Sequence, residues 1–224
     1  MMSLSEKIAA KNFPILASLP RNDLDLAKAA IAGGADGVKV HLNAHHRASG
    51  TVFGSFSAER PFLKKLAVLP VTKLIMIGQE EIPTPEELAE LKAMGFEGFN
   101  LYQKHARPYV FESGLRPILA LEHGYHHTQI TAITQYRDAW IEASIVDPAD
   151  YGKPLTDTDL QNYTQIAALA QRPVIVPSQK KITIEDLPSL RNTGVAALLL
   201  GIIVMGSTPA AIESTFGSFI SARL

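Results

Sequence analysis

Short apolar runs alternate with longer amphipathic stretches along the whole chain. Each apolar run has the length of a strand that is buried on both faces in a parallel sheet, and the stretches between the runs are long enough for helices. The eight runs are Pro14–Leu19, Gly37–Leu42, Val71–Ile77, Gly98–Tyr102, Pro117–Leu121, Trp140–Val146, Pro173–Val176 and Val195–Leu200. The pattern therefore predicts eight strands, each followed by a helix.

Several of the stretches between the runs begin with a helix-start signal. Thr84, Pro85 and Glu87 combine an N-cap residue, a proline at the first helical position and a capping-box glutamate. Thr208 and Pro209 repeat the first two of these features. These signals support helices between the predicted strands.

The eight strand–helix units predict one domain. In 224 residues there is no linker and no change of composition, so we expect a single (β/α)8 TIM barrel over residues 1–224. A doubly wound open sheet is the main alternative. The segment Leu4–Ala10 precedes the first run and is expected to form a short helix that closes the bottom of the barrel.

Composition and charge restrict the class of protein. Apolar residues make up 46% of the chain and charged residues 19%, which suits a large core and not a disordered chain. The 21 Lys and Arg nearly balance the 22 Asp and Glu, so we expect neither a nucleic-acid partner nor binding to a membrane surface. Cysteine is absent, the longest apolar run (195–205) is too short to span a bilayer, and the first residues do not resemble a signal peptide. We expect a soluble cytoplasmic protein, with a homodimer as a possible assembly.

All seven histidines follow the ends of predicted strands. In (β/α)8 barrels the loops after the carboxyl ends of the strands build the reaction face. The histidines are His41, His45, His46, His105, His123, His126 and His127. Their position is the strongest functional signal in the chain, although solvated loop histidines would give the same pattern.

The second predicted strand carries polar residues on one face. Period-two alternation points Lys39, His41 and Asn43 into the barrel. A buried lysine needs a partner, and Glu142 on the sixth run or Glu122 at the end of the fifth could supply it. Such a pair would place an acid and a base in a shielded cavity, with Lys39 polarising a carbonyl, either glutamate acting as base and His41 as second proton carrier. A structural salt bridge that fills the barrel is the alternative.

Further polar residues are candidates for substrate binding. Asn43, Asn100 and Tyr102 are placed to orient substrate hydroxyls, and Ser144 lies on the sixth run. Asn43 also begins a long loop whose glycines and polar residues suit a mobile lid. Within this loop, Arg47 could bind a carboxylate or phosphate through a bidentate fork. An ordinary surface excursion of the chain is the alternative interpretation of the loop.

The clustered histidines also allow a metal site. His41 with Glu122 or His123 could coordinate a divalent ion. A metal-dependent hydrolase or lyase that uses these histidines is therefore one alternative function. Apart from this ion, the residues indicate no required cofactor.

The closing stretch, PVIVPSQKKITIEDLPSLRNTGVAALLLGIIVMGSTPAAI, resembles the last two units of the ribulose-phosphate-binding barrels. In that family, a PVI strand precedes a small-residue loop and a Thr-capped helix, and backbone amides of the last two loops hold a phosphate. The resemblance implies a phosphate site at Ser178 and Gln179 on one loop and at Gly201 and Ile202 on the other. The glycines usual in the first loop are absent, and Lys180 could supply charge instead.

The segment 15–55 is similar to the ribulose-phosphate 3-epimerases in its strand, helix, Gly-Ala-Asp turn and long loop ending in Phe-Gly. The metal-binding His and catalytic Asp of their second strand fall on Lys39 and His41. Their third-strand His falls on Leu74, and their second catalytic Asp falls on Pro177. This chain therefore lacks the acid and base of that epimerase.

Two other barrel families are similar in parts but lack their catalytic residues here. N-acetylmannosamine-phosphate epimerases resemble the last units, but their third-strand Lys and seventh-strand Glu have no counterpart. Aldolases of the oxo-acid-phosphate type share the small N-terminal helix, but Trp140–Val146 contains no Schiff-base lysine. These departures argue against both activities.

Together, these features predict an enzyme that acts on a small phosphorylated sugar or sugar-derived acid. The reaction expected is proton transfer next to a carbonyl, as in an epimerase, isomerase or lyase. A barrel that has lost catalysis and binds a phosphorylated metabolite is a further alternative, favoured by the missing epimerase residues.

Overall fold

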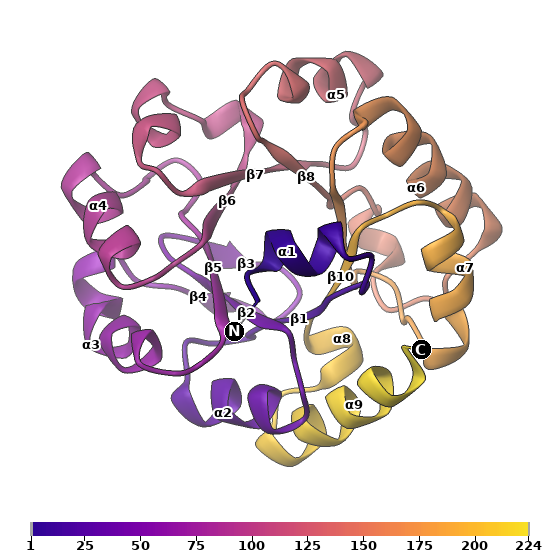
Figure 1. The fold of residues 1–224 in the computed structure, drawn as a ribbon, viewed down its shortest axis with the longest axis horizontal. Coiled ribbons are helices and arrows are strands. Elements are labelled where there is room, and N and C mark those ends of the chain that lie inside the picture. Colours follow the sequence, from indigo (N-terminus) through magenta and orange to yellow (C-terminus); the bar gives the residue numbers. More distant parts are fainter. Residues whose placement is uncertain (1, 224) are drawn as a thin grey trace.

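A computed structural model describes residues 2–223, and in it eight parallel strands close into a barrel surrounded by helices (Figure 1). The barrel strands are β1 (Ile15–Ser18), β2 (Gly37–His41), β5 (Thr72–Met76), β6 (Gly98–Tyr102), β7 (Arg116–Leu121), β8 (Trp140–Ala143), β9 (Val174–Pro177) and β10 (Ala197–Leu200). Each overlaps one predicted run, with bounds that differ by up to three residues. Because β1 pairs with both β2 and β10, the sheet is closed, and the open-sheet alternative is wrong.

Helices α2 to α7 and α9 surround the barrel, and α1 lies across one of its openings (Figure 1). The short helix α8 follows β10 directly. They are α1 (Leu4–Ala9), α2 (Leu24–Ala32), α3 (Phe56–Ala67), α4 (Pro85–Ala93), α5 (His127–Thr134), α6 (Asp157–Ala170), α7 (Leu187–Asn192), α8 (Ile202–Met205) and α9 (Pro209–Ala222). Thr84 forms the predicted capping box with Glu87, and the Thr208 side chain accepts a hydrogen bond from the Ala211 amide. Within residues 2–223, no helix combines the length and the apolar character needed to cross a bilayer.

Two connections differ from the simple alternation of strands and helices. Between β6 and β7 the chain forms only two 3-10 turns, Gln103–His105 and Pro108–Glu112, because the connection is short and contains a proline. The long loop after β2 contains a small hairpin of β3 (His45–His46) and β4 (Thr51–Val52). These pieces place extra side chains above the carboxyl ends of the barrel strands.

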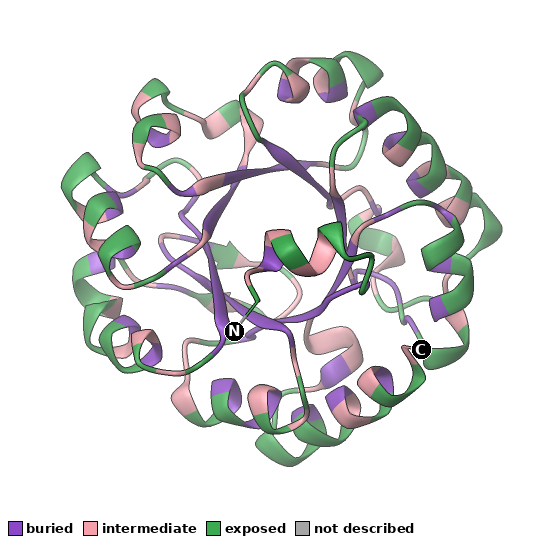
Figure 2. Ribbon diagram, viewed as in Figure 1, coloured by how far each residue is buried: buried purple, intermediate pink, exposed green. Residues whose placement is uncertain are grey.

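The buried apolar residues form two clusters, a large one that joins strands and helices and a small one that contains strand residues and Leu4 of α1. Figure 2 shows that the barrel strands are mostly buried, whereas the helices are buried only in part. The strand residues of the small cluster are Leu16, Leu74, Ile118, Trp140, Ile175, Ala197 and Leu199, and Leu4 of α1 packs against them. Leu4 is 1% exposed, and its amide donates to Glu97 at 3.0 Å. The predicted short helix at the bottom of the barrel is thus confirmed.

Asp36 fastens both ends of the described chain to this bottom face. Its carboxylate pairs with Lys7 of α1 at 2.8 Å and accepts a hydrogen bond from the Ile15 amide at 2.9 Å. The same carboxylate pairs with Arg223, directly after α9. The bottom of the barrel is therefore held by ion pairs as well as by apolar packing.

Helices α2 and α9 approach so closely at Gly33 that only glycine fits there. A Cβ at Gly33 would lie 2.6 Å from both the Glu213 carbonyl oxygen and the Phe216 Cβ. Gly33→Ala is expected to lower the free energy of unfolding by about 1–3 kcal/mol. As a matched control, Gly217→Ala in α9 meets open space and is expected to raise it by about 0.5–1 kcal/mol. Urea unfolding of both variants checks this, and equal effects would contradict it.

Candidate active site

A cavity of about 390 Å³ opens at the carboxyl ends of the barrel strands. Most of the predicted site residues line it: Lys39, His41, Arg47, Asn100, Tyr102, Glu122, His123, Glu142, Ser144, Ser178, Gln179, Gly201 and Ile202. Asn43 and Lys180 are not among its lining residues. The cavity lies where the reaction face of a (β/α)8 barrel is expected.

A buried ion pair forms the floor of the cavity. Lys39 on β2 donates to Glu142 on β8 at 2.7 Å and to the Asn100 side chain on β6 at 3.1 Å. The side chains of Lys39 and Glu142 are only 5% and 7% exposed. Asn100 is oriented by its own donation to the Ile118 carbonyl at 3.0 Å. An acid and a base are therefore held in contact in a shielded place, as the pattern of β2 predicts.

Glu122 has a different partner from the one allowed by the sequence. It pairs with Lys104 at 2.8 Å, and these two side chains are 42% and 55% exposed. An exposed pair of this kind is weak and does not reach the barrel floor. Of the two predicted partners of Lys39, the structure forms the pair with Glu142, and the pair with Glu122 is wrong.

His41 and His46 form an aromatic cluster with Phe53 at the side of the cavity. The His41 ring stacks on Phe53 at 4.6 Å between centroids and lies 4.9 Å from His46. The His41 Nδ1 is buried and has no hydrogen-bond partner within the described residues. Burial lowers the pKa of His41 well below its usual value, and Lys39 and then His46 lower it further. Burial and the neighbouring charges therefore both favour the neutral form of the His41 imidazole.

Asn43 does not point into the barrel as the alternation predicts. Strand β2 ends at His41, and Asn43 takes a left-handed conformation with φ of 46°. Its amide donates to the Gly54 carbonyl at 2.9 Å, at the base of the hairpin. Asn43 is therefore not among the residues that line the cavity, because the regular strand ends before it.

The loops after β9 and β10 touch each other at the place implied for a phosphate. The Ser178 hydroxyl accepts a hydrogen bond from the Gly201 amide at 2.7 Å. The Gly201 amide, one of the backbone donors implied for a phosphate, is thus already bonded to a side chain. The next residue, Ile202, is the first residue of α8. Gln179 lines the same region, but its side chain bonds to groups of the β8 loop.

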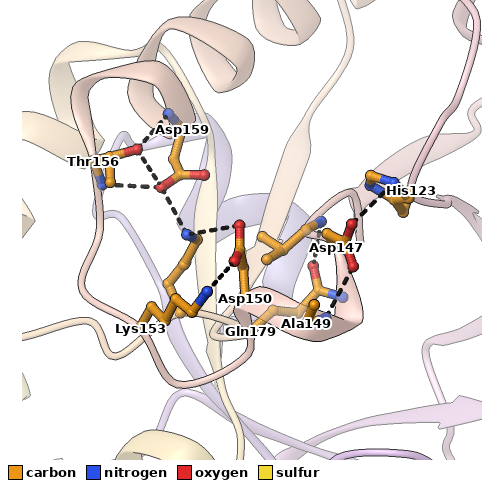
Figure 3. A network of polar contacts seen from close by, with 10 residues as sticks. His123, Asp147, Ala149, Asp150, Lys153, Thr156, Asp159 and Gln179 are labelled. Carbon is orange, nitrogen blue, oxygen red and sulfur yellow. Dashed lines mark hydrogen bonds and ion pairs between the residues drawn. The ribbon is translucent and has the colours of Figure 1, made fainter.

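Lys180 points away from the cavity. Its ammonium is buried and lies 3.4 Å from Asp159 and 3.9 Å from Asp150. Figure 3 shows these two carboxylates with Lys153 and Thr156, which lie in the connection between β8 and α6. Two consecutive residues of an extended loop place their side chains on opposite sides, so Gln179 faces inward and Lys180 outward. The prediction of Lys180 as a phosphate ligand is wrong.

The three residues considered for a metal do not converge. His123 lies 3.5 Å from Asp147, Glu122 pairs with Lys104, and His41 stacks on Phe53. Within the part of the chain that the structure describes, no group of three or more His, Asp or Glu side chains could hold a metal ion.

Other lining residues were not predicted. They include Ser18, Met76, Gln79, Lys104 and Tyr151, whereas the lining residue His105 is one of the seven histidines noted in the sequence. His45 and His46 reach the cavity because the hairpin folds back over it, and both belong to the histidine cluster noted in the sequence. Tyr151 follows the 3-10 turn Pro148–Asp150, and no periodicity in the sequence marks it.

Comparisons with known proteins bear on the fold. No protein-family model and no curated sequence matches the chain. Among solved structures, tryptophan synthase from M. tuberculosis has a TM-score of 0.73 at 11% identity, covering 99% of this chain and 98% of that one. For the tryptophan synthase A-subunit of Pyrococcus furiosus, the TM-score is 0.68 at 11% identity, covering 94% and 98%. Phosphoribosyl anthranilate isomerase from Thermus thermophilus gives 0.62 at 15% identity, also covering 94% and 98%.

The likeness is one of fold. Superposition over 94–99% of this chain shows that the fold is a (β/α)8 barrel. The narrower resemblance to epimerases is not shown by it. Because one barrel fold carries many chemistries, the reaction has to be argued from the cavity itself.

Proposed function

We propose that this protein is an enzyme that moves a proton next to the carbonyl of a small phosphorylated sugar or sugar-derived acid. The observation that carries the proposal is the contact of Lys39 with Glu142, 2.7 Å apart on the floor of the cavity. A fixed ammonium stabilises the negative charge that develops on a carbonyl oxygen, and an adjacent carboxylate can accept the proton.

The roles follow from position and charge. Lys39 would polarise the carbonyl and stabilise the enediolate, and Glu142 would act as the base. Asn100 holds the Lys39 ammonium in place at 3.1 Å. His41 lines the same cavity as Glu142 and is kept neutral by burial, so it would serve as the second proton carrier.

Support for a phosphorylated substrate comes from the resemblance of the last two units to phosphate-binding barrels. The residues that this resemblance implies, Ser178, Gly201 and Ile202, all line the cavity. One protein of similar fold is named phosphoribosyl anthranilate isomerase, so a barrel of this kind acts on a phosphorylated compound. This is support by analogy for the phosphate and not for the reaction.

Hydrogen exchange in D2O tests the proposal without knowledge of the net reaction. The protein is incubated with a panel of aldose phosphates, ketose phosphates and phosphorylated 2-oxo acids, and proton NMR follows the C–H next to each carbonyl. We expect exchange with at least one compound. Glu142→Gln is expected to slow it by about 100-fold or more, the usual contribution of a general base.

Glu122→Gln is the matched comparison, because it removes the second candidate carboxylate and leaves Glu142 in place. A large loss in Glu122→Gln with none in Glu142→Gln would overturn the assignment. Exchange with no compound, together with a saturable rise of the melting temperature on adding phosphates, would instead identify a binding protein without catalysis.

A further inference from the structure

We propose that Gln179 is a positioning residue that makes one wall of the cavity a hydrogen-bond donor surface and thereby selects a substrate with a carboxylate group. The donor wall consists of Ser144, Tyr151 and Tyr102, all of which line the cavity. The inference rests on the proposed function and deepens it, because it favours a phosphorylated sugar-derived acid over a neutral sugar phosphate.

The orientation of the Gln179 amide is fixed by a backbone group. The Val146 amide donates to Gln179 Oε1 at 3.2 Å. A backbone N–H can only donate, so it must face the oxygen of the side-chain amide and not its nitrogen. Gln179 is 7% exposed, and rotation of its amide would bring two donors together in a buried place.

The Gln179 nitrogen then faces two hydroxyl groups. Its Nε2 lies 3.0 Å from Ser144 Oγ and 2.5 Å from the Tyr151 hydroxyl oxygen. The nitrogen carries two hydrogens and no acceptor, so each hydroxyl oxygen accepts one hydrogen from it. Each hydroxyl can therefore donate its own hydrogen to another partner. Because Tyr151 lines the cavity, its hydroxyl can donate to a group bound there.

Tyr102 extends the donor wall from β6. Its side chain lines the cavity together with Ser144 and Tyr151. The Tyr102 hydroxyl carries one hydrogen, which it can donate into the cavity. Burial raises the pKa of Tyr102, the Ser144 hydroxyl opposes the rise and Glu142 adds to it. The hydroxyl therefore stays protonated at neutral pH and remains a donor.

The charges around the cavity also suit an anionic group. Lys39 is paired with Glu142, and Lys104 with Glu122, so these four charges nearly cancel. Arg47 lines the same cavity and takes part in none of these pairs within residues 2–223. Two free hydroxyl hydrogens and one extra cation match the acceptor oxygens of a carboxylate.

Two probes that differ in one group test the inference. 3-Phosphoglycerate carries a phosphate and a carboxylate, whereas glycerol 3-phosphate carries the phosphate alone. By isothermal titration calorimetry we expect the protein to bind 3-phosphoglycerate at least about tenfold more tightly, because hydrogen bonds to a charged group are worth about that factor each. In Gln179→Glu this preference is expected to disappear, since a carboxylate accepts both hydroxyl hydrogens and adds a negative charge.

Tyr151→Phe provides a second variant that keeps the shape of the wall and removes one hydrogen. We expect it to reduce the ratio of the two dissociation constants by about three- to tenfold, and it carries the test should Gln179→Glu fail to fold. A wild-type protein that shows no preference for 3-phosphoglycerate, or fails to bind it at millimolar concentration, would overturn the inference. So would a preference that both variants retain, because the wall would then not be its source.

The outcome is separate from that of the exchange experiment. Hydrogen exchange without carboxylate preference would leave the proposed function standing and remove this inference. Carboxylate preference that the variants abolish, without exchange on any compound, would support the donor wall and remove the proposed reaction.

Discussion

Glu142→Leu is expected to lower the free energy of unfolding by about 3–5 kcal/mol, because it leaves the Lys39 ammonium buried without its charged partner. Replacing both residues removes both charges. The double variant Lys39→Met/Glu142→Leu is therefore expected to be close to the wild type in stability, or above it, since a buried ion pair is often replaceable by apolar residues of similar size. Urea unfolding of Glu142→Leu, of Lys39→Met and of the double variant measures the coupling between the two residues.

The same three proteins separate a structural ion pair from a catalytic one. A stable double variant that has lost hydrogen exchange would show that the pair is needed for chemistry and not for folding. A double variant that is as unstable as either single one would contradict the assumption of an isolated pair, and would point to Asn100 as an essential third member.

Mild acid is expected to destabilise the folded protein before most carboxylates titrate. Burial, helped by Lys39 and His45, lowers the pKa of His46 from 6.5 to about 4, and the pKa of His41 is lowered as well. Between about pH 4 and pH 6.5, His46 therefore binds a proton in the unfolded chain and not in the folded chain. Stability is therefore complete above about pH 6.5 and falls with decreasing pH by about 1.4 kcal/mol per unit for each such histidine.

His46→Phe tests this assignment. The ring can keep its contact with Phe53, which lies 6.3 Å away between centroids, but it cannot be protonated. Between pH 5 and 6.5, we expect the unfolding free energy of the variant to change less steeply with pH than that of the wild type. The expected difference is about 1.4 kcal/mol per pH unit, which corresponds to one proton. An unchanged slope would mean that other groups cause the acid lability. The wild type serves as the control at pH 8, where neither protein carries charge at this position.

The strand pattern predicted the barrel because each strand is buried on both faces and so reads as a continuous apolar run. The same reasoning placed Lys39 and Glu142 inside, since period-two alternation holds as long as a strand is regular. It failed at Asn43, where a left-handed residue ends the regular geometry. The partner of Lys39 was left open between two glutamates because the distance between strands cannot be read from one sequence.

Loop geometry explains most of the remaining differences. Lys180 and Gln179 are neighbours in the sequence, yet their side chains have different surroundings. Lys180 pairs with Asp150 and Asp159, whereas Gln179 lies in the cavity wall. Tyr151 reaches the cavity only through the course of the chain after β8. Side chains in loops have no fixed period, so their direction depends on tertiary contacts that a single sequence does not contain.

The fastening of both chain ends at Asp36 has a practical consequence. Lys7 and Arg223 meet this carboxylate on the bottom of the barrel, whereas the cavity opens at the top. A fusion partner or a solid support attached beyond either end would lie on the side away from the cavity mouth. Immobilised through its termini, the molecule would present its cavity to the solution, which suits it to surface-based measurements of ligand binding.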